Sequence, residues 1–283
     1  MRSIILTLFA LVAFAANSFL NRWALLDADT GPISFSALRL FSGAVLLWLL
    51  VVARSSVWWP AFKPLSAISL FVYATSFSLA YVSLDVGLGA LVLFGGVQIT
   101  LFLLAVVWRE EIDSFRILGA TISFLGLCFL LMPSSIHNLN FYSVIFMLLA
   151  AMGWGLYTFK GHSSSDPLLE TAQNFVWATP LALVVYAIMP DALDTKGAIL
   201  AIVSGTVTSG IGYAVWYAVL PSFKSTTAAI LQLSVPLIGA FLGYLFLAEA
   251  LTWKLGFATG LVVLGAIVGL SYRRPKPFNR PNN

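Results

Sequence analysis

Most polar side chains that could bind a solute lie inside long apolar segments of this sequence. Of the 283 residues, 60% are hydrophobic and 9% are charged. Amide, indole and phenol groups can hydrogen-bond a solute, and an apolar neighbour cannot satisfy them. The candidates for substrate binding in a cavity are Asn17, Tyr81, Gln98, Trp154, Tyr157, Tyr213, Trp216 and Gln232. Together they could hold a small amphipathic or aromatic molecule.

Two further residues inside apolar segments could act on a solute differently. Arg39 lies six residues, roughly 9 Å, into its segment. Its charge could attract an anionic group, but the favoured interpretation is structural, with the side chain reaching lipid headgroups or pairing with a neighbour. Pro236 removes a backbone hydrogen bond and should bend its helix, as a hinge or as a static kink.

Two glutamates flank helix junctions. Glu111 precedes Ser114, and Glu249 precedes Thr252, in matching positions. A carboxylate and a hydroxyl so placed would cap the N-terminus of the helix that follows. We therefore predict that Glu111 and Glu249 are helix-junction caps.

The mode of energy coupling stays open at this point. No Asp or Glu lies in the middle of an apolar segment, so a buried proton relay is not evident. Coupling through Asp85 or Glu249, uncoupled exchange and facilitated diffusion all remain. A sodium ion could also be held by carbonyls and by the hydroxyls of Ser204, Thr206, Thr208 and Ser209.

The elements that position these residues are apolar runs of about 20 residues, the length of a membrane-spanning helix. Ten runs can be counted: 3–21, 33–53, 65–84, 87–108, 114–132, 139–159, 168–189, 197–219, 226–247 and 254–272. The loops between them are too short for a separate domain. We predict an all-α integral membrane protein with ten transmembrane helices.

Lysine and arginine are divided unequally between the two sides if the ten helices alternate in direction. With the N-terminus in the cytoplasm, eleven fall inside and three outside, while Arg39 lies within the second run. The outside residues are Arg22, Lys196 and Lys254. Because short cytoplasmic loops are enriched in these residues, we predict that both termini are cytoplasmic.

The two halves of the sequence align at an offset of 138 residues. Residues 89–121 then lie over residues 227–259, and Glu111 meets Glu249. A hydroxyl, an aromatic and a basic residue follow each glutamate in the same register. These matches are more informative than the coincidences of Leu, Ala and Val that apolar sequences produce, and they predict an internal repeat.

Each predicted repeat holds five helices, an odd number, so the second must enter the membrane from the opposite side. We expect a first five-helix repeat over residues 1–135, an inverted second over 136–272, and a basic, disordered cytoplasmic tail over 273–283. Inverted repeats are typical of secondary transporters, which bind solutes between the repeats near the midplane. The sequence therefore predicts a carrier that works by alternating access.

The chain resembles the EamA-type drug/metabolite transporters over essentially its whole length. The resemblance lies in the five-plus-five layout, in Phe35-x-x-x-Arg39, and in Ala228 followed by Pro236 and Glu249. It implies an inner-membrane (plasma-membrane), multi-pass carrier, of which many export amino acids or other small metabolites. It also implies a cavity lined mainly by the first, third, fourth, sixth, eighth and ninth helices. One departure is visible, because Gln98 stands where symmetry would place a second proline.

Two other classes of membrane protein stay open. An embedded enzyme would need grouped histidines, a nucleophile with its base or a metal cluster, but His137 and His162 lie in loops predicted on opposite sides. A receptor or structural protein would not need an inverted repeat. The N-terminal run, with Arg2 and an Ala-Phe-Ala triplet at 13–15, also mimics a signal peptide, although the run continues to Leu20.

The expected partners are a small-molecule substrate and the lipid bilayer, without nucleic acid. No cofactor is expected, and the single cysteine, Cys128, offers no metal site. Two Gly-x-x-x-Gly pairs, at 239–243 and 265–269, let helices approach closely. Contact within one chain is the favoured interpretation, and a dimer stays open.

Overall fold

The computed structural model describes residues 2–27, 29–54, 59–107, 114–132, 140–161, 164–222 and 231–271. Throughout these ranges all regular structure is helical, and they contain no strand. Glu111 and both histidines lie outside the described residues, so the prediction of a cap at Glu111 stays a prediction. The fold is thus assembled from helices alone across the described part of the chain.

The α-helices overlap the predicted apolar runs, although the first helix extends to Asp27, beyond the run 3–21, and the helix in the run 226–247 begins at Ser234. The first five are α1 (Arg2–Asp27), α2 (Pro32–Arg54), α3 (Pro64–Tyr81), α4 (Val86–Val107) and α5 (Ser114–Leu131). The next are α6 (Phe141–Gly161), α7 (Pro167–Ile188), α8 (Thr195–Val203), the π-helix η1 (Ser204–Ile211), α9 (Gly212–Val219) and the 3₁₀ turn η2 (Leu220–Ser222). The last are α11 (Ser234–Leu247) and α12 (Trp253–Leu270).

Seven of the helical spans in the described residues are long and apolar enough to cross a membrane. These are α1, α2, α3, α4, α6, α7 and the continuous series from α8 to η2. Three shorter apolar helices lie within α5, α11 and α12. Large apolar side chains are widely exposed, as at Ile4, Phe246 and Trp253. Such a surface suits lipid contact, and the chain is a multi-pass membrane protein.

Proline and polar side chains set several helix starts. Pro32, Pro64 and Pro167 occupy first helical positions, where a missing N–H group costs nothing. Asp166 accepts a hydrogen bond from Leu169 N at the start of α7. The Asp166 carboxylate also pairs with Arg54, and this pairing lowers the pKa of Asp166.

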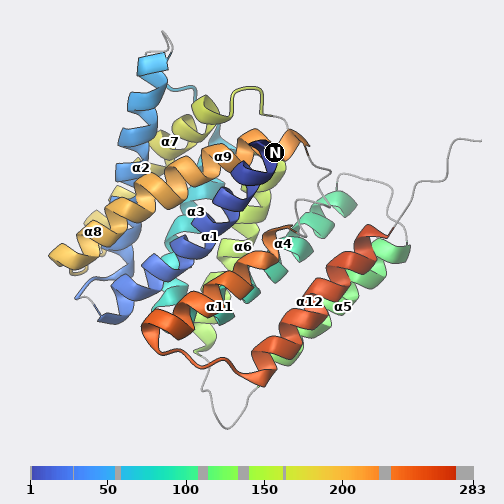
Figure 1. Ribbon diagram of the computed structural model, residues 1–283. Coiled ribbons are helices and arrows are strands. Elements are labelled where there is room, and N and C mark those ends of the chain that lie inside the picture. The colour runs from blue at the N-terminus through green and yellow to red at the C-terminus, as the bar shows by residue number, and fades with distance from the viewer. Residues whose placement is uncertain are drawn as a thin grey trace, which may run out of the picture.

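The helices form a bundle in which distant parts of the chain pack together (Figure 1). Contacts join α2 to α7, α4 to α11, and α5 to α12. Two further contacts join α3 to α6 and α1 to the series α8–η1–α9. In Figure 1, α5 and α12 lie side by side at one edge of the bundle, and α2, α7 and α8 lie toward the opposite edge. At the α5–α12 contact Gly265 lies against backbone of α5, in agreement with an intrachain role for this small residue.

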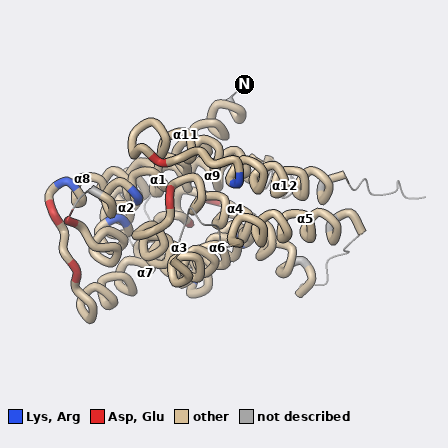
Figure 2. The backbone as a smooth tube through the Cα atoms, turned by 90° about the horizontal axis from the view of Figure 1, so that it is seen from below, with Lys and Arg blue, Asp and Glu red and all other residues tan. Residues whose placement is uncertain are grey.

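Charged residues are confined largely to the ends of the helices. Figure 2 views one such end, where the few blue and red positions interrupt an otherwise tan backbone. At this end Lys196 lies 5.0 Å from the centre of the Trp23 ring. At the opposite end Lys63 Nζ pairs with Glu170 Oε1 at 3.1 Å. The long middle of the bundle therefore contains few charges, and each buried charge there requires an explanation.

Two helices of the first half receive N-terminal caps from the second half: Asp191 caps α2, and Glu249 caps α4 at Val86 N. Asp191 accepts hydrogen bonds from Ile33 N at 2.8 Å and Ser34 N at 2.7 Å, at the start of α2. A side chain at Gly31 would collide with the Asp191 carboxylate, so this close approach needs glycine. Carboxylates at helix N-termini are favourable because they satisfy free N–H groups. These caps hold the two halves of the bundle together at one end.

Candidate functional site

A buried arginine lies at the centre of the polar interior. Arg39 of α2 is 1% exposed. Its Nε donates to Ser209 Oγ at 2.9 Å, and its Nη2 donates to Tyr213 OH at 2.8 Å and to Tyr73 OH at 3.4 Å. The guanidinium also lies 5.2 Å from the ring centre of Phe77. The interpretation that Arg39 reaches lipid headgroups is therefore wrong, because neutral partners from three other elements hold it inside the bundle.

Asn17 of α1 organises the hydroxyl groups next to this arginine. Its Oδ1 lies 2.7 Å from Ser204 Oγ and 3.2 Å from both Thr208 Oγ1 and Ser209 Oγ. Its Nδ2 lies 3.4 Å from Tyr73 OH. Asn17, Arg39, Tyr73, Ser209 and Tyr213 are called the Arg39 cluster below.

The two tyrosines of the Arg39 cluster come from different halves of the chain. Tyr73 of α3 and Tyr213 of α9 are 140 positions apart, and their hydroxyls are 2.9 Å apart. Both side chains are almost completely buried. A hydroxyl both donates and accepts, so this pair can rearrange its hydrogen bonds when another group enters.

The π-helix η1 brings its polar side chains against α2. At Gly205 a side chain would collide with the backbone oxygen of Arg39 and with Ser42 Oγ. The lack of a Cβ therefore allows η1 to approach α2 at this point. The wider turn of a π-helix is often found at functional sites, and here Ser204, Thr208 and Ser209 all lie within hydrogen-bond distance of Asn17.

Aromatic rings cover one side of the Arg39 cluster. Trp154 of α6 lies 4.7 Å from Tyr213 and 5.4 Å from Phe14, ring centre to ring centre. Its Nε1 donates to Gln232 Oε1 at 3.1 Å. Trp216 packs edge-on against Phe14 at 5.5 Å. The predicted candidates Asn17, Trp154, Tyr213, Trp216 and Gln232 thus lie around one buried region.

Three of the predicted candidates have other surroundings. The ring of Tyr157 stacks on Trp154 at 5.6 Å and also contacts the ring of Tyr217 at 5.0 Å. Tyr81 donates to Val86 O at 3.3 Å, near the start of α4. The amide oxygen of Gln98 accepts from Ser123 Oγ of α5 at 3.1 Å. Gln98 is therefore engaged with α5 through its amide oxygen, while its amide nitrogen has no hydrogen-bond partner among the described residues.

Pro236 lies in the first turn of α11, where a missing backbone N–H is tolerated. The helical hydrogen bonding is interrupted by a turn at Leu233, just before α11 begins. The sequence favoured one bent run, whereas the described residues contain a break ahead of the proline. A hinge at Pro236 stays a prediction. The turn at Leu233, three residues earlier, is where the helix is interrupted.

The hydroxyl groups named as a potential sodium site do not all point the same way. Ser204, Thr208 and Ser209 converge on Asn17 Oδ1. Thr206 donates instead to the backbone oxygen of Ile202, four residues earlier in the chain. Among the described residues no three His, Cys, Asp or Glu side chains gather in a way that could hold a metal ion.

Glu249 caps a different helix from the one predicted. Its Oε2 accepts from Val86 N at 2.8 Å, at the start of α4, while Thr252 Oγ1 alone caps the following helix, α12, through Leu255 N. The left-handed backbone of Ala248, with φ of 54°, precedes this reversal. Capping of α12 by Glu249 is therefore a wrong prediction. The chain turns back at Ala248 and directs Glu249 toward the first half.

Arg22 and Asp85 complete a second polar group around Glu249. Arg22 Nε lies 3.6 Å from Glu249 Oε1, and Arg22 Nη2 lies 3.8 Å from Asp85 Oδ1. Burial and repulsion by Asp85 raise the pKa of Glu249 to about 7, against the opposing effects of Val86 N–H and Arg22. Arg22 also donates to the carbonyl oxygens of Tyr81 and Val82, at the end of α3.

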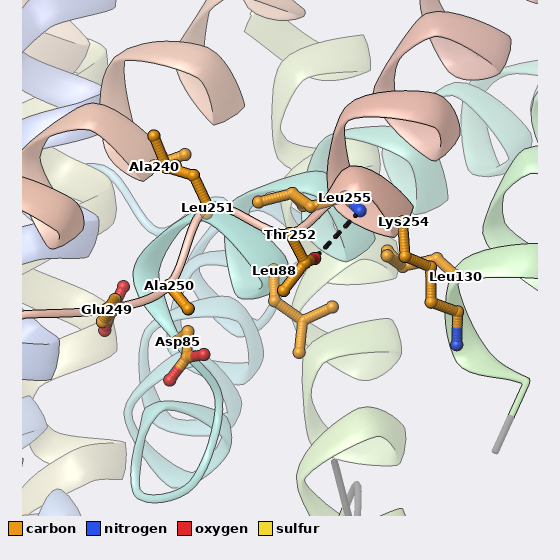
Figure 3. A pocket seen from close by; sticks show the side chains of 11 residues that line it. Asp85, Leu88, Leu130, Ala240, Glu249, Ala250, Leu251, Thr252, Lys254 and Leu255 are labelled. Carbon is orange, nitrogen blue, oxygen red and sulfur yellow. Dashed lines mark hydrogen bonds between the residues drawn. The ribbon is translucent and has the colours of Figure 1, made fainter. Parts of the chain in front are cut away.

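A small hollow lies beside this second group (Figure 3). Its volume is about 40 Å³, which is room for about three water molecules. Figure 3 shows Asp85 and Glu249 on one side of the hollow and Lys254 on the other. The remaining lining residues are Gly87, Leu88, Leu130, Ala240, Ala250, Leu251, Thr252 and Leu255. This hollow has room for water but not for a metabolite. The Arg39 cluster is the stronger candidate site on chemical grounds, because it joins a buried guanidinium to hydroxyl groups and aromatic rings.

Several residues at these two sites are not among the candidates predicted from the sequence. Tyr73 and Phe14 were not predicted as site residues, although each contacts a residue 140 positions later, Tyr213 for Tyr73 and Trp154 for Phe14. That common spacing is close to the repeat offset and could have identified them. Arg22 was counted only as a loop charge, and no local signal connects it to Glu249.

Comparisons with known proteins agree with this architecture. An uncharacterised protein of Pseudomonas aeruginosa is 44% identical over 270 residues, which cover 94% of this chain and 93% of that protein. The model of the EamA-like transporter family matches residues 141–271. This chain belongs to the EamA-like transporter family.

Other similarities of this EamA-like protein are more distant. An uncharacterised transporter of Archaeoglobus fulgidus is 25% identical over 248 residues, or 84% of this chain and 88% of that protein. The uncharacterised transporter YoaV of Bacillus subtilis is 22% identical over 255 residues, or 85% of each. A crystal structure with 14% identity superposes with a TM-score of 0.68 over 95% of this chain and 97% of that one, which supports the fold. The EamA-like protein is therefore a membrane transporter.

Proposed function

We propose that this EamA-like protein is a secondary transporter that exports small amphipathic metabolites, such as amino acids, across the inner (plasma) membrane by alternating access. Its solute would bind at the Arg39 cluster, which combines polar groups with aromatic surface in the interior of the bundle. Such a mixture of an apolar wall and a few polar groups is typical of small-molecule sites.

One observation carries this proposal. Tyr73 contacts Tyr213, and Phe14 contacts Trp154, and the members of each pair are 140 positions apart. Residues near a pseudo-two-fold axis contact their own counterparts in the other repeat. The two pairs therefore support an axis through the aromatic and polar interior, where inverted-repeat carriers bind their solutes.

The packing of whole helices supports the same symmetry. An axis relating α1 to α6, α2 to α7, α3 to the series α8–η1–α9, α4 to α11 and α5 to α12 predicts particular contacts. Three helices contact their own counterparts under this axis: α2 contacts α7, α4 contacts α11 and α5 contacts α12. The axis also maps the contact between α3 and α6 onto the contact between α1 and the series α8–η1–α9. All of these contacts occur. We infer ten transmembrane helices in two inverted repeats of five.

The charges at the two ends support cytoplasmic termini. Arg54, Lys63 and Lys160 lie at or beside helix ends on one side. Two of these cations pair with acidic residues of the other half, since Arg54 contacts Asp166 and Lys63 contacts Glu170. In our proposal this side faces the cytoplasm, in accordance with the enrichment of cytoplasmic loops in basic residues.

Contacts between the halves close the bundle at both ends. At the proposed cytoplasmic end these are the Arg54–Asp166 and Lys63–Glu170 pairs. At the other end Glu249 contacts both Arg22 and the start of α4. We infer an occluded arrangement in which alternating access would break one set of contacts at a time.

Transport by purified protein tests the proposal. The protein is reconstituted into liposomes, and a panel of labelled metabolites is followed in both directions, with and without a proton gradient, against protein-free liposomes. We expect at least one solute to move. If no member of a broad panel moves in any condition, the carrier proposal fails, and a membrane-embedded enzyme or a receptor becomes the better hypothesis.

Two glutamines provide a matched pair of variants for this assay. Gln232 contacts Trp154 in the interior, whereas Gln98 contacts Ser123 of α5. We expect Gln232→Leu to lower the flux several-fold and Gln98→Leu to leave it near the wild-type value. Equal effects of the two changes would argue against a solute site beside Trp154.

A further inference from the structure

Arg39 is a buried cation without a carboxylate partner among the described residues. Its hydrogen-bond partners are Ser209, Tyr73 and Tyr213, which are all neutral. Its Nη1 has no hydrogen-bond partner in the described chain. The guanidinium is therefore held in place on one edge while donor capacity on the other remains unused.

The energetics of burial make this arrangement unusual. An arginine keeps its charge at any physiological pH, so it cannot avoid the cost of burial by losing a proton. Buried charges in proteins are normally paired or bound to an ion. Charged groups inside membrane-spanning segments accordingly mark substrate and ion pathways. The missing partner of Arg39 is best supplied by a group that is not part of the described chain.

We propose that Arg39 is the anion-binding residue of the transport site and that the transported solute carries a carboxylate. This inference rests on the proposed transport function and deepens it by specifying the substrate class. A carboxylate fits because it can accept two parallel hydrogen bonds from a guanidinium. The hydroxyls of Tyr73 and Tyr213 already lie near Nη2 and could turn to donate to the same anion.

The surroundings of Arg39 also indicate what the rest of the solute contains. The rings of Phe77, Tyr73 and Trp154 offer apolar surface close to the guanidinium or to its tyrosine partners. The Arg39 cluster contains no Asp or Glu that would pair with an ammonium group. The carboxylate is therefore the required group, and an amino group on the same molecule is not. Organic acids and amino acids share this chemistry, while amines lack it.

Binding of matched compounds tests the inference. Each set contains an amino acid, the same skeleton without its amino group, and the same skeleton without its carboxylate. One set is leucine, 4-methylpentanoate and 3-methylbutylamine, and parallel sets carry small and aromatic side chains. Binding to the protein in lipid nanodiscs is measured by calorimetry at pH 7. In at least one set we expect the acid, with or without the amino acid, to bind at least 10-fold more tightly than the amine.

Variants connect this binding to the guanidinium. Arg39→Gln should abolish carboxylate binding, and Arg39→Lys, which keeps the charge but loses the planar pair of donors, should weaken it about 10-fold or more. Lys254→Gln removes a cation at the start of α12, outside the Arg39 cluster and the pairs that join the two halves, and should leave binding unchanged. Circular dichroism and gel filtration establish that each variant is folded. If neither Arg39 variant folds, the comparison of acid and amine on the wild-type protein still decides the matter.

The outcomes separate this inference from the proposed transport function. Equal binding of acid and amine in every set, binding of no acid at all, or unchanged binding in folded Arg39→Lys and Arg39→Gln would overturn the inference. Flux of amines that persists in Arg39→Gln would leave the transporter standing and the anion site refuted. Carboxylates that bind through Arg39 but never cross the liposome membrane would support the site and refute transport. Relative binding of the amino acid and its deaminated counterpart identifies which source of carboxylate is preferred.

Discussion

Two buried arginines of this EamA-like transporter differ in their partners. Arg22 lies near one end of the bundle, with Glu249 and Asp85 within 4 Å and two carbonyl oxygens of α3 as acceptors. Arg39 lies in the interior with neutral hydrogen-bond partners only. Among the described residues each arginine has one buried nitrogen without a hydrogen bond, Nη1 in Arg39 and Nε in Arg22, but only Arg22 has carboxylates nearby. The first environment neutralises its charge and joins the halves, which is a structural role. The second leaves its charge available, which is what a binding site requires.

The largest effect on stability is expected from removing the charge of Arg22, which pairs with Glu249 and Asp85. At pH 8, where Glu249 is largely ionised, Arg22→Gln would leave the carboxylates of Glu249 and Asp85 facing each other without a cation. Removal of one partner from a largely buried ion pair destabilises strongly, so we expect a loss of about 3 kcal/mol in the free energy of unfolding. Denaturation in detergent micelles measures it.

A double substitution shows whether this loss belongs to the pair. Arg22→Gln combined with Glu249→Gln removes both opposite charges and should cost less than the sum of the two single changes. Strictly additive effects would mean that the two side chains act independently, and the contrast with Arg39 would lose its basis.

The pH dependence of stability should come second in size. The pKa of Glu249 is about 7, above the ordinary value of 4.5, because burial and Asp85 disfavour its charge. Between these values the native state holds a proton that the unfolded state has released, so stability falls as the pH rises through this window and levels off above it. Allowing for solvent screening, we expect a loss of about 1 to 2 kcal/mol between pH 5 and pH 8. Thermal unfolding of wild type and Glu249→Gln checks this, and an equally steep slope in the variant would assign the effect to another group.

A smaller change in stability is expected at the charge without a carboxylate partner. Arg39→Gln loses hydrogen bonds to Ser209 and Tyr213 but also relieves the burial of an unneutralised charge. These effects oppose each other, so the free energy of unfolding should stay within about 1 kcal/mol of wild type. The same denaturation assay applies. A loss as large as that of Arg22→Gln would make Arg39 a structural residue and remove the distinction between the two arginines.

The smallest effect concerns the turn that directs Glu249 toward Arg22. Ala248 has φ of 54°, a conformation that glycine adopts without steric cost. Ala248→Gly should therefore raise the free energy of unfolding by about 0.5 kcal/mol, since relief of strain slightly exceeds the added entropy of the unfolded chain. Ala248→Val serves as the opposite control and should destabilise. A stabilising valine would show that the turn relaxes readily and does not determine where Glu249 points.

The helices were predictable because membrane thickness imposes a length that composition reveals directly. The run predicted at 114–132 and the helix Ser114–Leu131 differ by one residue. Tyr213 and Trp154 were predictable as aromatic residues with a polar tip inside apolar runs, and the spacing of 140 positions leads from them to Tyr73 and Phe14. Helix positions and aromatic candidates could therefore be predicted, because they depend on local composition or on the internal repeat.

The remaining contacts depend on distant parts of the chain and on side-chain direction. Counting residues placed Arg39 inside its helix, but a position along a helix does not say whether a side chain faces lipid or the interior. The sequence predicted that Glu249 caps the next helix, because such caps are usually local. Its carboxylate instead accepts a hydrogen bond from the backbone N–H of Val86, 163 positions away. The turn at Leu233, ahead of Pro236, likewise has no glycine to mark it.

The caps that cross between the halves have a consequence for how opening can be observed. The amide protons of Ile33, Ser34 and Val86 are hydrogen-bonded to Asp191 or Glu249. If the halves separate at this end, these three amides lose their acceptors together, even though α2 and α4 stay helical. Hydrogen–deuterium exchange at the first turns of these helices would then report the opening of this end of the bundle. Exchange at these three amides would therefore follow the separation of the halves at this end without an attached label.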